Sequence, residues 1–154
     1  MSGIEVRLVR GPIAGERLAA PPAAPASAGG ECVFIGRTRA ERHPDLGPLR
    51  ALEYEAHESM ALRTIEAIAR DAMARFACES VQVLHSVGRV RVGEASVSVR
   101  VMARGREEAF AACRQIIDRL KAEAPIWKRE VWERGATWQQ GVAAAAPGLA
   151  EGGR

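Results

Sequence analysis

The sequence lacks several features that would assign a chain quickly to a class of protein. Its three cysteines contain no C-x-x-C pair, which argues against a disulfide framework or a zinc site and indicates a reducing compartment. No apolar run approaches the roughly 18 residues of a membrane span, and no signal-peptide pattern opens the chain. Neither phosphate-binding glycine loop is present, and the three histidines form no H-x-x-x-H pair. We therefore expect a cytoplasmic protein with no metal site and no membrane segment.

The composition is that of a globular protein, with 47% apolar and 27% charged residues among 154. This length predicts one domain over residues 1–140, with an Ala-, Pro- and Gly-rich loop at 19–30 and a flexible tail at 141–154. The net charge of +3 comes mostly from arginine, and the basic residues are scattered among acids. Such a charge favours anionic small molecules, acidic proteins or nucleic acid about equally.

Two hydrophobic periods alternate along the chain. A period of two predicts strands at residues 4–9, 31–39, 49–56, 81–85, 95–102 and 126–132, the strand at 95–101 being half-buried. A period near 3.6 predicts helices at about 58–77 and 105–122. Clusters of strands before each helix indicate an α+β fold, in which two helices cover a mainly antiparallel sheet.

Finer expectations follow from the same patterns. Met60 belongs to the inward face of the first helix, and Phe110 heads the inward stripe of the second, ahead of Cys113. Residues 40–48, with two prolines and a glycine, predict a turn. Residues 90–92, between two glycines, read as a short connection after the strand that His85 ends.

The most informative segment is residues 117–130, where a helical pattern stops at Pro125 and an extended segment follows. Lys121 and Lys128 stand on either side of this break. Both are compatible with ordinary surface charge. The rigid turn also allows both to point into one shared space, which suits chemistry on an anionic or acyl-type substrate.

Two arginines stand at the ends of predicted elements. Arg106 is placed at a helix N-terminus, where free backbone N–H groups and a guanidinium together bind anions. Arg39 ends a strand at a loop. Each alone is typical of a solvated arginine, whereas together with the two lysines they form four cations that can converge on one phosphate-bearing ligand.

Other reactive residue types have structural interpretations. His57 is placed near a helix start, and His85 is expected to bond a nearby backbone group. The cysteines have no neighbouring base and are expected to be structural. For the three tryptophans two interpretations stay open, a hydrophobic plug that closes the sheet or an interface: they are Trp127, Trp132 and Trp138.

Several motifs, taken in order, resemble the large subunit of molybdopterin synthase. The strongest is Leu120-Lys121 followed by residues 124–130 (APIWKRE). The other matching segments are FIGRTR at 34–39, LEYEA at 52–56 with Met60-Ala61, LH at 84–85, VG at 87–88, GE at 93–94, AF at 109–110, IID at 116–118, Gly135 and Trp138. The resemblance covers about residues 4–140.

This resemblance implies a hammerhead-type α+β fold and a homodimer within a heterotetramer. The partner it implies is a small ubiquitin-like sulfur carrier that ends in a Gly-Gly thiocarboxylate. Sulfur passes to cyclic pyranopterin monophosphate and forms the dithiolene of molybdopterin, with no cofactor and no metal at this step. Lys121 and Lys128 are implied as catalytic residues that also bind substrate, with Arg39, Arg106 and Glu130 as further substrate-binding residues.

The chain departs from the family pattern at a few positions. Gly105 stands where the family usually has a histidine, Ser86 replaces a common arginine, and His43 lies in a slightly long loop where it can replace a lost polar group. An alternative function is therefore a non-catalytic module that binds the carrier but has lost the chemistry. A small RNA-binding protein is a weaker alternative, because the aromatic-basic interleaving of an RNA-binding sheet is missing.

Overall fold

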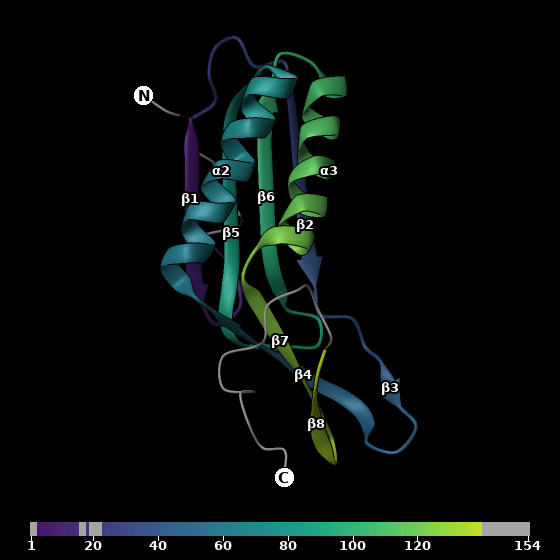
Figure 1. Cartoon of the computed structure of the whole chain (residues 1–154). Helices are drawn as coiled ribbons and strands as arrows, with labels where there is room; N and C mark the ends of the chain where they lie inside the picture. The colour runs from purple at the N-terminus through teal and green to yellow at the C-terminus, as the bar shows by residue number, and fades with distance from the viewer. Residues whose placement is uncertain (1–2, 16–17, 19–22, 140–154) are drawn as a thin grey trace.

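The computed structural model describes residues 3–15, 18 and 23–139, so the predicted tail at 141–154 and part of the 19–30 loop lie outside the described residues. Eight strands and two helices follow one another in the described chain. They are β1 (Ile4–Arg10), β2 (Gly30–Arg37), β3 (Arg42–His43), β4 (Gly47–Ala56), α2 (Glu58–Phe76), β5 (Cys78–Arg91), β6 (Ala95–Ala103), α3 (Arg106–Glu123), β7 (Ile126–Trp132) and β8 (Gly135–Trp138). The predicted α+β fold is confirmed (Figure 1).

All eight strands join one sheet, in which the order β2-β6-β5-β4-β7-β8 is antiparallel throughout. β1 pairs in parallel with β5, and β3 pairs with β4. The long strand β5 therefore serves two regions: its first part pairs with β1 and β6, and residues 88–91 pair with β4.

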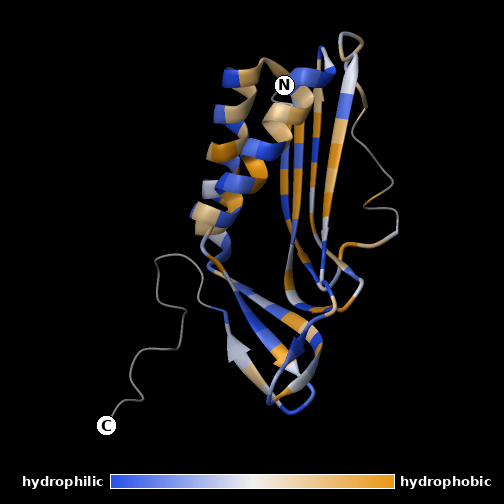
Figure 2. Cartoon of the chain, turned by 90° about the vertical axis from the view of Figure 1, so that its right-hand side faces the viewer, coloured by the Kyte–Doolittle hydropathy of each residue, from blue (hydrophilic) through white to orange (hydrophobic). Residues whose placement is uncertain are grey.

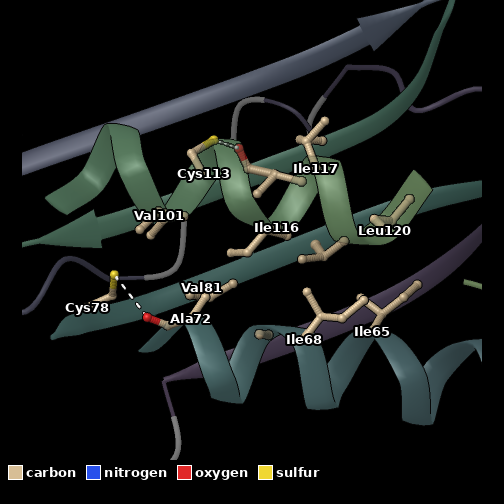
Figure 3. Close-up of a cluster of buried hydrophobic side chains, with 14 of the residues drawn as sticks. Ile65, Ile68, Ala72, Cys78, Val81, Val101, Cys113, Ile116, Ile117 and Leu120 are labelled. Carbon is tan, nitrogen blue, oxygen red and sulfur yellow. Dashed lines mark hydrogen bonds between the residues drawn. The ribbon is translucent and has the colours of Figure 1, made fainter. Parts of the chain in front are cut away.

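The first region, which we call the helix-covered layer, consists of β1, β2, β6 and the first part of β5 under α2 and α3. Both helices lie on the same face of the sheet (Figures 1 and 2). Aliphatic side chains fill the space between, including Ile65 and Ile68 of α2, Ile116 of α3 and Val81 of β5 (Figure 3). Their burial fixes where each helix lies on the sheet.

The second region, which we call the small lobe, consists of β3, β4, β7 and β8 and extends beyond the helices (Figure 1). Its buried apolar cluster contains only Leu49, Leu52 and Trp132. Polar contacts supplement it: Trp132 Nε1 donates to Thr137 Oγ1 at 2.9 Å, and Arg50 pairs with Glu133 at 3.1 Å. The backbone pairing of β4 with β7 positions the residues of this lobe.

Three strand predictions were wrong. Residues 90–91 are not a connection, because β5 continues through Gly88, whose positive φ of 87° a glycine adopts without strain, and Val90 is buried opposite Leu52. His85 consequently lies within the strand. Residues 40–48 are more than a turn, since they contain β3 and the start of β4. The strand at 95–101 is buried on both faces, Ser96 and Ser98 included.

Two helix predictions were also wrong. Met60 and Phe110 are exposed by 46% and 63%. In α3 the predicted residues Cys113, Ile117 and Leu120 are buried, but Ala109, Ala112 and Ile116 are buried with them, so the centre of the buried face lies about 50° around the helix from the predicted stripe. Small alanines at the centre of this face let the helix approach the sheet closely. Within the described residues, neither helix has the length and apolar character needed to cross a membrane.

Candidate functional site

A cavity of about 540 Å³ lies where the helix-covered layer meets the small lobe. Its walls come from the end of β2 and the segment after it, the start of β6, the last turn of α3, and the facing strands β4 and β7. The volume falls within the ordinary range of small-molecule sites. The predicted residues Arg39, Lys121, Lys128 and Glu130 all line it.

The break at Pro125 brings the two lysines together, as predicted. Lys121 lies in the last turn of α3, whose C-cap Ala124 is already extended, and Lys128 lies two residues into β7. The Pro125 carbonyl accepts a hydrogen bond from the His57 amide at 3.3 Å, which ties the break to the start of α2. These are the only two lysines among the 154 residues, where the other 20 basic side chains are arginines. Every ε-amine of this protein therefore faces one cavity.

Lys128 is half-buried, and its surroundings change its acidity. Its pKa lies below the ordinary value of 10.5, chiefly because burial removes water from the ammonium group. The positive charges of Lys121 and Arg39 lower it further, while Glu130 and Glu41 act in the opposite direction. This amine gives up its proton more readily than an exposed lysine does.

Arg39 reaches the cavity from the segment after β2. Near the end of β2, Gly36 packs closely on β6, since a Cβ there would come within 2.6 Å of Val97 Cγ1, and the strand register shifts directly after it. The guanidinium of Arg39 pairs with Glu41 at 2.8 Å and remains largely exposed. An anionic ligand therefore meets an arginine that is already oriented by a carboxylate.

Glu130 lies two residues beyond Lys128 on the same face of β7. Its carboxylate accepts a hydrogen bond from Thr137 Oγ1 at 3.2 Å, and that same hydroxyl accepts from Trp132 Nε1. Glu130 is thus held by the small lobe, next to Lys128 as predicted.

Arg106 does not join the other cations within this chain. It begins α3, as predicted, whereas Lys121 lies in the last turn, about 22 Å away along the helix axis. Gly105 is the N-cap and supplies no side-chain hydrogen bond. A single chain therefore brings together three of the four predicted cations.

The sequence analysis missed an uncharged wall of the cavity. It contains Thr38, Tyr54, His85 and Ser96. Thr38 is only 2% exposed, and its Oγ1 finds no partner among the described residues. A signal for Tyr54 was present, because it shares a strand face with Leu52; the buried serines and Thr38 carry no such signal.

His85 has the predicted backbone contact, with Nδ1 donating to the Ser86 carbonyl at 2.8 Å. Its ring meets Tyr54 edge-on, with ring centres 5.2 Å apart. Burial lowers the pKa of His85, and this hydrogen bond acts against that shift. Burial likewise raises the pKa of Tyr54, opposed by a hydrogen bond with Ser96. Both rings are uncharged at neutral pH.

The remaining candidates have structural roles where the structure describes them. His57 caps α2 by accepting from the Met60 amide at 3.4 Å, and His43 accepts from two amides of its own turn and packs on Trp132. Burial raises the pKa of Cys78 to about 11 and that of Cys113 to about 12, so neither thiol is an activated nucleophile.

The plug interpretation of the tryptophans holds for Trp132, which is buried against Leu49 and Leu52. Trp127 and Trp138 are half-buried, and for them an interface stays a prediction.

Comparison with known proteins gives consistent results. The sequence model of the MoaE protein family matches residues 10–123. The molybdopterin synthase catalytic subunit of Pyrococcus abyssi is 40% identical over 116 residues, which cover 75% of this chain and 76% of that protein. The crystal structure of molybdopterin synthase from Staphylococcus aureus superposes with a TM-score of 0.76 at 27% identity, covering 91% of this chain and 98% of that one. A complex of subunits 1 and 2 of molybdopterin-converting factor from Helicobacter pylori shares the fold, with a TM-score of 0.69 at 22% identity over 86% and 88% of the two chains.

Proposed function

This chain belongs to the MoaE protein family, and we propose that its lysine-lined cavity is where it acts as the catalytic subunit of molybdopterin synthase. The chain is a sulfur-transferring enzyme of molybdenum cofactor biosynthesis. The observation that carries the assignment of the site is the convergence of Lys121, Lys128 and Arg39 on one cavity. The substrate we assign to it is cyclic pyranopterin monophosphate.

The partner is a small, ubiquitin-like sulfur carrier. The Helicobacter pylori neighbour is a complex of two subunits, which supports a second subunit as the partner of this chain. We assign to this chain an extended Gly-Gly tail with a C-terminal thiocarboxylate, which enters the cavity beside the lysines. The cavity excludes bulk water from the tail and orients it, and both effects favour transfer over hydrolysis. We place the enzyme in the cytoplasm.

The cations match the charge of the reactants. A thiocarboxylate, a cyclic phosphate and a developing oxyanion are all negative, so fixed positive groups stabilise the charge that forms in the transition state. Lys121 and Lys128 supply such positive groups from two walls of one cavity. Arg39 adds a guanidinium, which can bind a phosphate through two N–H groups.

Lys128 also fits the role of a proton carrier. Its lowered pKa brings the amine closer to neutral pH, where a group that both gains and loses a proton is most effective. Glu130, held by Thr137, lies beside it and gives the ammonium form a counter-charge. Lys121 then acts mainly through its charge.

Arg106 reaches a substrate only from a second copy of the chain. Within one chain it lies about 22 Å along α3 from Lys121. We therefore propose that a homodimer, within a heterotetramer with two carriers, places Arg106 of one protomer near the cavity of its partner. The variant Arg106→Ala is then expected to lower substrate affinity without altering the lysines.

The decisive experiment is a reconstitution with a thiocarboxylated carrier and cyclic pyranopterin monophosphate, in which product is measured by the fluorescence of its oxidised derivative. Lys121→Ala and Lys128→Ala are each expected to reduce the rate by about 10²-fold or more, because each removes a key electrostatic group. Arg114→Ala is the matched control, since it removes one positive charge from the exposed side of α3.

Near-normal rates for both lysine variants would contradict the proposed mechanism. Tight carrier binding without any product from the wild-type chain would instead support the alternative function, a docking module that tolerates Gly105 because it carries out no chemistry.

A further inference from the structure

Lys128 is not held in place by an ion pair. Of the salt bridges among the described residues, which join arginines to carboxylates within 4.0 Å, none includes Lys128. A lysine side chain has four rotatable bonds and loses much entropy when it is fixed. Whatever orients this amine must therefore be the surface against which its stem packs.

Tyr54 is placed to supply such a surface. In the antiparallel pair of β4 and β7, Tyr54 stands directly opposite Lys128, so the two side chains project from the same face with their Cβ atoms about 5 Å apart. On its other side Tyr54 pairs with Gly88 of β5, which has no side chain. The ring is consequently free to extend past the glycine and reach His85.

Two further residues lie beside the tyrosine. The ring of His85 meets it edge-on, with an interplanar angle of 82° between the two rings, and Ser96 lies close enough to the hydroxyl to lower the pKa of Tyr54. His85 is itself 6% exposed and bonded through Nδ1 to the Ser86 carbonyl, which prevents its ring from turning. Strands β4, β5 and β6 thus build one rigid, uncharged wall beside Lys128.

Four charged groups also act on Lys128, and charged groups hold water instead of excluding it. They are Glu130 on its own strand, Lys121 from α3, and Arg39 and Glu41 from the segment after β2. The two carboxylates raise the pKa of Lys128 and the two cations lower it, so these effects oppose one another, whereas the loss of water only lowers the pKa. Of the cavity's uncharged residues, Tyr54 is the one placed in direct strand register with the lysine.

We propose that Tyr54, held by the ring of His85, is the positioning residue that orients Lys128 and shields one side of it from water. Its benefit to sulfur transfer rests on the proposed function of the cavity, whereas the positioning itself does not.

The composition makes a direct test practical. Reductive methylation with ¹³C-formaldehyde labels only Lys121, Lys128 and the terminal amine, so the spectrum contains two lysine resonances, and Lys128→Arg identifies which one belongs to Lys128. In the wild-type chain the Lys128 resonance is expected to titrate below 10.5. Tyr54→Leu, which keeps an apolar group but removes the ring, is expected to move that titration up toward 10.5, whereas Tyr54→Phe retains the ring and is expected to stay close to wild type.

Circular dichroism confirms that each variant is folded, and Tyr54→Met serves as a second ring-free variant where Tyr54→Leu does not fold. An unchanged Lys128 titration in a folded, ring-free variant would overturn the proposal. So would an equal upward shift in Tyr54→Phe, because the hydroxyl and not the ring would then be responsible. If the titration shifts as expected but the wild-type chain makes no product in the reconstitution, the positioning stands and the proposed function fails.

Discussion

The helix-covered layer and the small lobe hold their residues in place by different means. In the first, apolar side chains from the two helices and from strands β5 and β6 form one continuous buried cluster. In the second, a buried cluster of three residues is supplemented by hydrogen bonds and ion pairs that include exposed and half-buried groups. The cavity lies between them and takes one lysine from each, Lys121 from the layer and Lys128 from the lobe.

The difference shows that the two lysines of one site are positioned by two kinds of structure, one with a large apolar core and one with a small core. Lys121 is located by the packing of α3, because Ile117 and Leu120 anchor the last turns of that helix. Lys128 is located by strand register, since β7 lies between β4 and β8 and has little core beneath it. The predictions below test whether the two supports differ as much as this comparison claims.

The largest expected effect on stability comes from the layer. Ile68 is fully buried between α2 and the sheet (Figure 3), and Ile68→Ala is expected to reduce the free energy of unfolding by about 2–5 kcal/mol, since it leaves a cavity. Urea unfolding followed by circular dichroism measures this change. A loss below about 1 kcal/mol would mean that the layer is not the stronger support.

A smaller and more local effect is expected in the lobe. Trp132→Ala removes the largest member of the three-residue cluster and the donor to Thr137, and we expect a loss of about 1–3 kcal/mol. Hydrogen exchange is expected to accelerate in β3, β7 and β8 while the amides of α2 and α3 keep their protection. Equal acceleration in the helices would show that both regions unfold as one unit.

A pH-dependent effect is expected at the junction. The pKa of buried His85 is lowered in the folded chain, so below the ordinary value of 6.5 the unfolded chain binds more protons. Stability therefore falls as the pH drops from 6.5 toward the folded pKa, by at most about 1.4 kcal/mol per pH unit for this one group.

The slope is measured as the difference between wild type and His85→Gln in urea midpoints from pH 8 to pH 5. The variant is expected to lose part of the acid sensitivity. An identical slope in both proteins would indicate that His85 does not titrate on unfolding.

The smallest effect is expected on the outer surface of the layer. Arg119 of α3 pairs with Asp71 of α2 at 2.9 Å and with Glu123 of its own helix, and these partners raise its pKa. Because the pairs are partly exposed to water, Arg119→Gln is expected to cost at most about 1 kcal/mol, and less at high salt. A loss comparable to that of Ile68→Ala would show that ion pairs, and not the apolar cluster, join the helices.

Periodicity in the sequence was sufficient for much of the fold. It predicted both helices and the antiparallel sheet, because side chains buried on one face recur at a fixed spacing. It failed at Gly88, which a single sequence does not distinguish from a turn glycine, since pairing with β4 decides that the strand continues. It also rotated the buried face of α3, because small alanines contribute little to a hydrophobic pattern although they lie at the centre of the contact.

The part of the site whose residues lie close together in the sequence could be predicted. Lys121 and Lys128 flank one turn, so the break at Pro125 was enough to bring them together. Arg106 was grouped with them because it stands at the end of a predicted element and because the family resemblance implies it, and the length of α3 separates it from them within one chain. Tyr54, His85 and Ser96 come from three different strands, and only the register of the sheet places them side by side.

The continuous course of β5 has a mechanical consequence. One unbroken strand of 14 residues carries hydrogen bonds to both regions, so a rotation of the lobe against the layer would have to break the bonds of β5 with β4, or those with β1 and β6. A two-domain enzyme with a flexible linker admits its substrate by swinging open and then closes over it. In this protein the distance between the walls is fixed by the backbone, so we expect the time for ligand entry to be set by how a slender chain end threads between them.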